Sequence, residues 1–63
     1  MATFLNISAK DGTQHLIFID KISNVYRDQQ GNTVIVMVNG NNIVTRFSFE
    51  ELIRMIDEKR KQQ

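Results

Sequence analysis

Residues 33–52 read TVIVMVNGNNIVTRFSFEEL, and this stretch decides the fold. Its first part, residues 33–38, is rich in β-branched side chains and apolar on both faces, which is typical of a buried strand. Asn39-Gly40 follows with the chemistry of a tight hairpin turn, so we expect a strand over 42–47 to run back along the first. At Ser48 the pattern changes to that of a helix start. The stretch therefore predicts a β-hairpin followed directly by an α-helix.

The helix is predicted over residues 49–61. Ser48 and Glu51 form the S-x-x-E capping box, and Phe47, just before the cap, is placed to pack against Leu52. One apolar stripe recurs at helical spacing: Phe49, Leu52, Ile53 and Ile56. Two acid-before-base pairs four residues apart lie on the outer face, Glu50–Arg54 and Asp57–Lys61. These features together predict an amphipathic C-terminal helix.

Two further turn signals, Asp11-Gly12 and Gly31-Asn32, divide the rest of the chain into segments of strand length. The three-residue step from Ile19 to Ile22 to Val25 favours a tight turn or a short 3₁₀ segment between two strands. We expect five strands, over 3–8, 14–19, 22–28, 33–38 and 42–47. The predicted fold class is α+β, a small antiparallel β-meander of four or five strands with the C-terminal helix packed on the sheet.

Length and composition restrict the class of protein. A chain of 63 residues allows a single domain, residues 1–63. Its 41% hydrophobic and 24% charged residues are typical of a globular domain and not of a disordered tail. The absence of cysteine excludes disulfides and thiolate metal sites. No apolar run approaches the roughly 18 residues of a transmembrane helix, and no secretory signal is visible, so we expect a cytoplasmic protein without membrane insertion.

The small size also predicts association. A chain this short buries only about 60% of its unfolded surface, which leaves its stability marginal. Self-association is a common remedy when disulfides are excluded. The segments 16–19 and 34–38 present apolar side chains to both faces of the sheet, and one helix covers only one face. We therefore expect a homo-oligomer, although a sheet curled into a small barrel or an unknown protein partner would also cover the second face.

No catalytic constellation is visible, so we expect no enzyme activity, no cofactor, no metal site and no small-molecule substrate. His15 is the one histidine, and no nucleophile or carboxylate is grouped with it. We interpret it as a half-exposed strand residue that forms a hydrogen bond with a neighbour. Three aspartates, Asp11, Asp20 and Asp28, stand beside turn signals, where carboxylates accept backbone N–H groups.

The leading hypothesis is a non-catalytic protein–protein interaction module that associates with itself and has a regulatory or accessory role. Its interface residues are predicted to lie outside the helix-facing core: Phe4, Ile17, Ile19, Ile35 and Met37. Strand parity alone does not orient a sheet, so which set of side chains faces the helix is open at this point. An aspartate at Ile35 should split an oligomer but spare the fold, whereas unfolding would identify Ile35 as a core residue.

The alternative is a small DNA- or RNA-binding regulator. Its candidate residues are cations in or near loops and strands: Lys10, Lys21, Arg27 and Arg46. The net charge is only +1, so the field of a single chain is weak, but an oligomer would multiply any basic patch. Nucleic-acid binding through these residues would show a steep dependence on salt, because phosphate contacts release counterions.

The pattern of residues 5–56 resembles the short flagellar and swarming motility protein family. The shared features are Asp11-Gly12 after the first strand, the valine strand that ends in Asn39-Gly40, and the acidic helix that starts at Ser48. The same region is similar to the core of LytTR-type DNA-binding domains, in which a polar turn, a strand and a Ser-x-x-Glu-Leu helix start follow one another. The second resemblance implies DNA binding, and neither assigns a binding residue.

Overall fold

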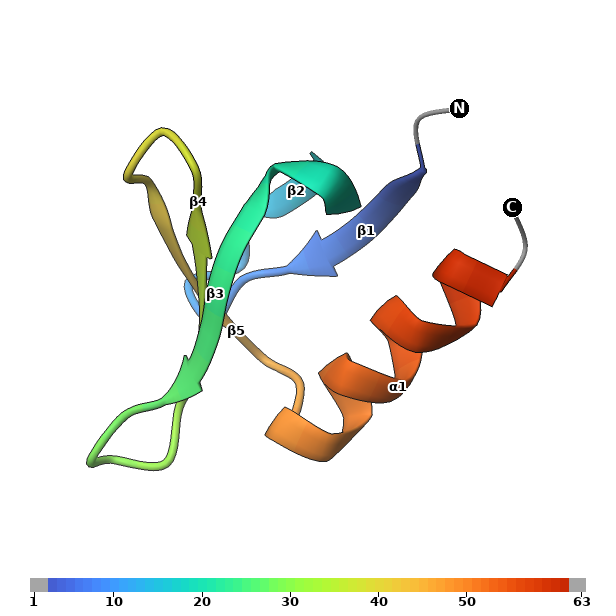
Figure 1. The fold of residues 1–63 in the computed structure, drawn as a ribbon. Helices are drawn as coiled ribbons and strands as arrows, with labels where there is room; N and C mark the ends of the chain where they lie inside the picture. Colours follow the sequence, from blue (N-terminus) through green and yellow to red (C-terminus); the bar gives the residue numbers. More distant parts are fainter. Residues whose placement is uncertain (1–2, 62–63) are drawn as a thin grey trace.

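The computed structural model describes residues 3–61 (Figure 1). These residues form five strands, one short 3₁₀ helix and one α-helix: β1 (Phe4–Ser8), β2 (Gln14–Phe18), η1 (Ile19–Lys21), β3 (Ile22–Arg27), β4 (Thr33–Met37), β5 (Asn42–Thr45) and α1 (Phe49–Lys61). The predicted α+β class, with antiparallel strands and a C-terminal helix, is confirmed. Compared with the predicted ranges, β1 begins one residue later. β2, β3 and β4 each end one residue earlier, and β5 ends two residues earlier.

The strands belong to two sheets and not to one continuous meander. β1 pairs with β2, and the second sheet has the order β3-β4-β5, with every pair antiparallel. The division falls at η1, where the Ile19–Ile22–Val25 spacing predicted a 3₁₀ turn. This turn redirects the chain, so β3 leaves the edge of β2 and pairs with β4 instead.

Backbone hydrogen bonds join the two sheets beside the β1–β2 hairpin. There the Lys10 N–H donates to the carbonyl of Val44 over 2.8 Å, the Arg46 N–H donates to the carbonyl of Ser8 over 3.0 Å, and Ala9 forms an isolated bridge with Thr45. The two sheets are therefore tied together around a shared interior.

The three hairpin turns use one device. In each, the side-chain oxygen of an Asp or Asn accepts the backbone N–H two residues further on, over 2.9 to 3.0 Å; the pairs are Asp11 and Thr13, Asp28 and Gln30, and Asn39 and Asn41. The last of these turns also contains Gly40, whose φ of 93° is strained for any residue with a Cβ. The predicted role of Asp11 and Asp28 as turn residues is confirmed.

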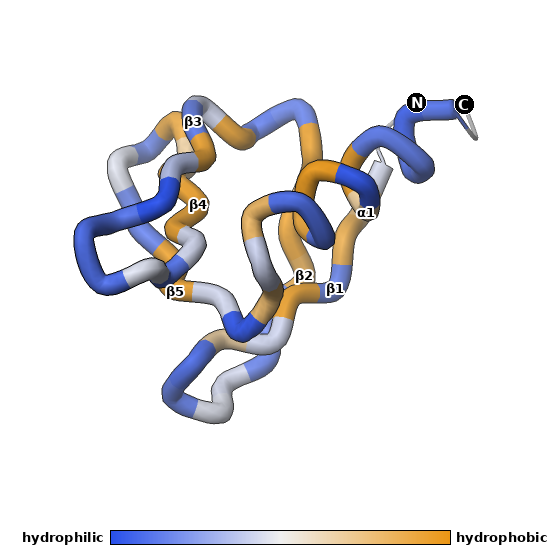
Figure 2. The backbone as a smooth tube through the Cα atoms, turned by 90° about the horizontal axis from the view of Figure 1, so that it is seen from below, coloured by the Kyte–Doolittle hydropathy of each residue, from blue (hydrophilic) through white to orange (hydrophobic). Residues whose placement is uncertain are grey.

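One hydrophobic core lies between the two sheets and the helix. Its buried members come from β1 and the residue after it, and from β2, η1, β4, β5 and α1: Leu5, Ile7, Ala9, Ile17, Ile19, Ile35, Ile43, Leu52 and Ile56. On β1 the inward residues alternate with polar or exposed ones, as expected for a half-buried strand. Figure 2 shows the corresponding separation along the backbone, with hydrophilic stretches at the hairpin turns and apolar stretches along the strands.

The helix α1 packs beside β1 (Figure 1) and buries Leu52 and Ile56. Its start is capped as predicted, because the Ser48 hydroxyl accepts the N–H of Glu51 over 3.1 Å. Phe47 is partly buried against the core cluster that contains Leu52.

Of the two ion pairs predicted on the surface of α1, the structure contains one. The predicted Asp57–Lys61 ion pair is present, with 3.2 Å between Nζ and Oδ2. The predicted pairing of Glu50 with Arg54 is wrong. Glu50 instead accepts a hydrogen bond from Arg27 of β3 over 3.0 Å, because the fold brings the end of β3 beside the first turn of the helix.

Candidate interaction surface

The structure places three of the five predicted interface residues in the core. Ile17, Ile19 and Ile35 are buried, and the side chain of Ile35 has no exposed surface. As members of an exposed face they were assigned wrongly. Phe4 is exposed, and Met37 is half-buried at the edge of the core. Only these last two are accessible to a partner without unfolding.

The error concerns orientation and not periodicity. On β2, Ile17 does alternate with its neighbours, but it points toward the core cluster. On β4, Ile35 lies between Val25 and Ile43 in the register of the sheet and also points inward. Strand alternation identifies two sets of side chains, and only the packing of the second sheet and the helix selects which set is buried.

The outward set of β2 contains residues that the sequence analysis did not select. Leu16 is 63% exposed, and Phe18 is also exposed. Phe18 lies directly opposite Phe4 in the β1–β2 register, and their ring centroids are 4.6 Å apart. Strand alternation could have identified them, because Leu16 and Phe18 alternate with Ile17 in the same apolar run and therefore lie on the opposite face of the strand.

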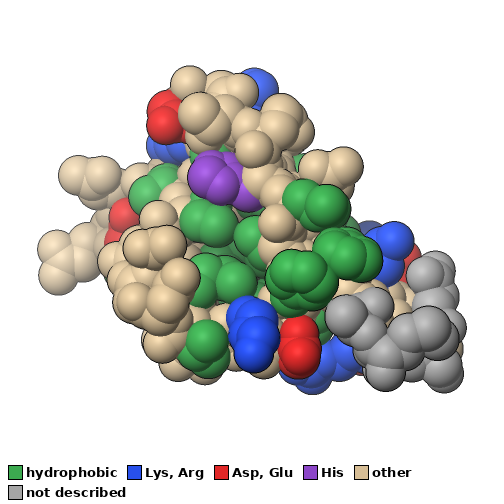
Figure 3. Space-filling view, turned by 90° about the horizontal axis from the view of Figure 1, so that it is seen from above, with side chains coloured by type: hydrophobic (Ala, Val, Ile, Leu, Met, Phe, Trp, Pro, Cys, Tyr) green, Lys and Arg blue, Asp and Glu red, His purple; other side chains and the backbone are tan. Residues whose placement is uncertain are grey.

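These residues belong to a larger apolar surface. A groove of about 680 Å³ lies between β2 and the β4–β5 hairpin, and its lining includes Leu16, Phe18, Met37 and Val38. Val38 is 61% exposed. Figure 3 shows this side of the molecule, where apolar side chains gather around the one histidine. We call the group consisting of Phe4, Leu16, Phe18, Met37 and Val38 the apolar surface.

The four predicted nucleic-acid-binding cations are held in different surroundings. Arg27 forms the ion pair with Glu50 and lies over the ring of Phe49, 5.4 Å from its centroid. The Lys10 ammonium donates a hydrogen bond to Asn32. Lys21 lines the groove beside the apolar surface, and Arg46 follows β5, where its N–H donates to Ser8. Two of the four thus already have side-chain partners, and the contacts of the four involve different elements.

Three carboxyl groups have a lowered pKa, and hydrogen bonds are the main cause in each case. Hydrogen bonds from the hydroxyl and N–H of Thr13 lower the pKa of Asp11, and the backbone N–H of Asn32 is the largest cause that lowers the pKa of Asp28. A backbone hydrogen bond within Glu50, followed by Arg27, lowers the pKa of Glu50. Asp11 and Glu50 are exposed and Asp28 is half-buried. Local hydrogen bonds explain the lowered pKa of each group, so none of the three shifts indicates a catalytic site.

His15 behaves as the sequence suggested. It is half-buried, and its Nε2 lies 3.1 Å from the hydroxyl of Thr13. Among residues 3–61, no group of three or more His, Cys, Asp or Glu side chains is arranged to hold a metal ion. The helix of the described chain is also too short and too polar to cross a membrane.

Comparison with known proteins gives no relative. No family model, curated protein or solved structure matches this chain. The resemblances to motility proteins and to LytTR-type domains therefore stay predictions.

Proposed function

We propose that this chain is a non-catalytic protein-interaction module that associates with itself through the apolar surface. The observation that supports this is the exposure of Leu16 and Val38, each more than 60% accessible, beside the paired rings of Phe4 and Phe18. Isolated exposed apolar residues are ordinary, but contiguous ones mark interaction sites. Aromatic residues and methionine are enriched at such sites, and this surface contains both.

The size of the chain makes association energetically important. A standard interface buries about 800 Å² per partner, which is roughly a fifth of the 4504 Å² that this chain exposes. Burying one large apolar side chain contributes about 1.5–3 kcal/mol. Because a domain of this length has little stability of its own, covering several such side chains would be a substantial part of its total stability.

The direct test is the mass in solution, measured by light scattering on a size-exclusion column over a dilution series. We expect wild-type protein to have at least twice the monomer mass of 7.3 kDa at high concentration. Leu16→Glu should give a folded monomer, because a charge at this exposed position is tolerated by the fold but not by a buried interface.

Arg46→Glu is the matched control, since it introduces the same side chain at an exposed position outside the apolar surface. It should leave the mass unchanged. A wild-type monomer at every concentration would contradict self-association, and an oligomer that survives Leu16→Glu would place the interface elsewhere.

The alternative proposal is a DNA- or RNA-binding regulator that uses Lys10, Lys21, Arg27 and Arg46. Its support is weaker, because Arg27 is neutralised by Glu50 and the four cations have separate surroundings. Mobility of short DNA and RNA duplexes at low salt tests it. A complex that weakens steeply with added salt would favour this alternative, and an unshifted band would end it.

A further inference from the structure

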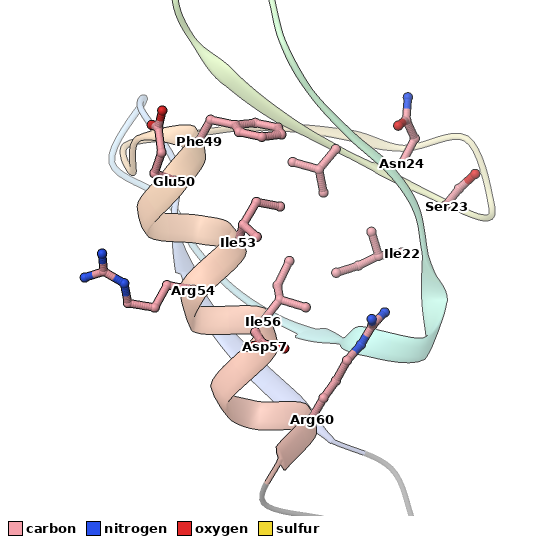
Figure 4. A pocket seen from close by; sticks show the side chains of 11 residues that line it. Ile22, Ser23, Asn24, Phe49, Glu50, Ile53, Arg54, Ile56, Asp57 and Arg60 are labelled. Carbon is pink, nitrogen blue, oxygen red and sulfur yellow. The ribbon is translucent and has the colours of Figure 1, made fainter.

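A second groove, of about 760 Å³, lies on a different part of the molecule, between β3 and α1 (Figure 4). Its apolar lining comes from both elements: Ile22 and Val25 on β3, and Phe49, Ile53 and Ile56 on α1. The apolar stripe of the helix is wider than the core that it covers, because Leu52 and Ile56 are buried whereas Ile53 is 42% exposed. The helix thus presents apolar side chains to this groove as well as to β1.

The strand that borders the groove lies at the edge of its sheet, and no other strand among residues 3–61 pairs with its outer side. β3 is the outer member of the order β3-β4-β5. Four consecutive residues of β3, residues 22–25, line the groove, so the groove runs beside this outer strand.

The register identifies which backbone groups are free at this edge. The Asp28 N–H donates to the Asn32 carbonyl over 2.9 Å, so this is a hydrogen-bonded pair of the β3–β4 ladder. Such pairs alternate in an antiparallel ladder, so Tyr26 bonds to β4, whereas Val25 and Arg27 direct their N–H and C=O groups outward. Within residues 3–61, no other element forms backbone hydrogen bonds with Val25 or Arg27. A β-bulge between Ile22 and Asn24 restricts regular pairing to this part of the strand.

Of the charged side chains that line the groove, the acids are in ion pairs within residues 3–61 and the arginines are not. The two acids are both occupied, Glu50 by Arg27 and Asp57 by Lys61. In contrast, Arg54 and Arg60 form no ion pair with any residue of the described range 3–61. In Figure 4 the side chain of Arg60 reaches from the last turn of α1 toward β3. The groove therefore has an uncompensated positive charge.

We propose that this groove binds an extended segment of a partner protein. The segment adds as a strand to the edge at Val25 and Arg27, seats apolar side chains against Phe49 and Ile53, and presents an acidic group to Arg60. Each part of the proposal follows from one observation. The free strand edge favours a ligand with an extended backbone. The apolar wall favours apolar side chains at alternate positions of that ligand, and the unpaired arginine favours an anionic group. This site is separate from the apolar surface, so it stands or fails independently of self-association.

The experiment uses random ten-residue peptides displayed on phage and selected against the full chain, with the enriched peptides then synthesised. We expect enriched sequences to alternate apolar residues and to contain Asp or Glu. Ile53→Glu and Arg60→Glu should each weaken binding at least about tenfold. A matched control introduces glutamate outside the groove and outside the apolar surface: Arg46→Glu after β5. It should stay within about twofold of wild type. Arg60 is exposed near the end of the helix, so Arg60→Glu tests the proposal even if Ile53→Glu perturbs folding.

Two further measurements examine the binding mode. N-methylation of alternate peptide amides should abolish binding in one parity and be tolerated in the other, because only one set of N–H groups faces the strand edge. Amide resonances of Val25 and Arg27 should shift when peptide is added. The proposal would be overturned by a selection without enrichment, or by peptides whose binding is lost with Arg46→Glu. It would equally be overturned if the amide resonances of Val25 and Arg27 shifted when the protein was concentrated without peptide. That result would mean that a second copy of the chain occupies the groove.

Discussion

At the scale of single residues, burial separates side chains that look alike in the sequence. Ile35 and Val38 both stand in the apolar run 33–38, yet Ile35 is wholly buried and Val38 is exposed. The same scale shows one polar defect, because the buried hydroxyl of Thr33 lacks a hydrogen-bond partner within residues 3–61. Thr45, also buried, donates its hydroxyl to the Thr33 carbonyl over 3.1 Å.

Replacing Ile35 by aspartate should unfold the protein, and not merely dissociate it. A charge at a fully buried position without a partner costs several kcal/mol, which is comparable to the total stability of so small a domain. Circular dichroism during urea titration measures this. Leu16→Asp is the control, because the same charge on the exposed face should leave the chain folded. A folded Ile35→Asp protein would contradict the burial of Ile35.

Thr33→Val should raise the free energy of unfolding by about 1 kcal/mol, because it removes an unsatisfied buried hydroxyl and keeps the shape of the side chain. Thr45→Val should lower it by a similar amount of about 1 kcal/mol, since that hydroxyl is hydrogen-bonded. Urea midpoints of the two variants, compared with wild type, provide the measurement. Destabilisation by both substitutions would indicate that the Thr33 hydroxyl is satisfied in solution.

At the scale of elements, the turns and the helix start are stabilised by hydrogen bonds between residues that are close together in the chain. Asp28 illustrates this, because its carboxylate accepts the N–H groups of Gln30 and Asn32 over 2.9 and 2.8 Å within a single turn. The Ser48 cap of α1 is equally local. The pairing of Glu50 with Arg27 is the exception, since it depends on the position of β3 relative to the helix.

Asp28 in the β3–β4 turn should make the free energy of unfolding decrease at acid pH. The pKa of Asp28 is lowered from its ordinary value of 3.8, chiefly by the backbone N–H of Asn32. Its contribution is therefore complete above that value and is lost as the pH falls through the lower pKa of the folded state. Asp28→Asn retains a side-chain oxygen but does not titrate, so it should lose less stability than wild type between about pH 5 and about pH 2. Urea midpoints across this range measure the difference, and identical pH profiles would contradict the role of this carboxylate.

At the scale of the whole molecule, the two sheets and the helix of the described residues 3–61 enclose one core, and apolar side chains outside it line two separate grooves. The apolar surface lies over β2 and the end of β4, and the second groove lies between β3 and α1. The fold therefore has separate places for a second copy of the chain and for an extended partner segment. Neither place coincides with a basic patch made by the four predicted cations.

Self-association should make the thermal midpoint rise with protein concentration, because mass action favours the associated folded state. Leu16→Glu should remove this concentration dependence and also lower the midpoint at high concentration. Differential scanning calorimetry over a wide concentration range checks both expectations. A concentration-independent midpoint for the wild type would mean that association contributes nothing to its stability.

Much of the fold was predictable because its signals are local. The helix from 49 to 61, the hairpin turns and the 3₁₀ turn after β2 all depend on residues close together in the chain. The candidate site was predictable only in part. Phe4 was selected and is exposed, whereas Leu16 and Phe18 were missed and Ile17 and Ile35 were placed on the wrong face. Alternation is symmetric between the two faces of a strand, so it contains no information about which face a distant element covers.

The sequence by itself determined the class of fold, the turn chemistry and the helix cap, since each depends on the conformational preferences and hydrogen bonds of neighbouring residues. Only the tertiary structure decided that η1 separates two sheets, that Ile35 points inward, and that Glu50 pairs with Arg27 and not with Arg54. Those outcomes depend on contacts between residues far apart in the chain. They are set by packing around one shared core, which local periodicity does not specify.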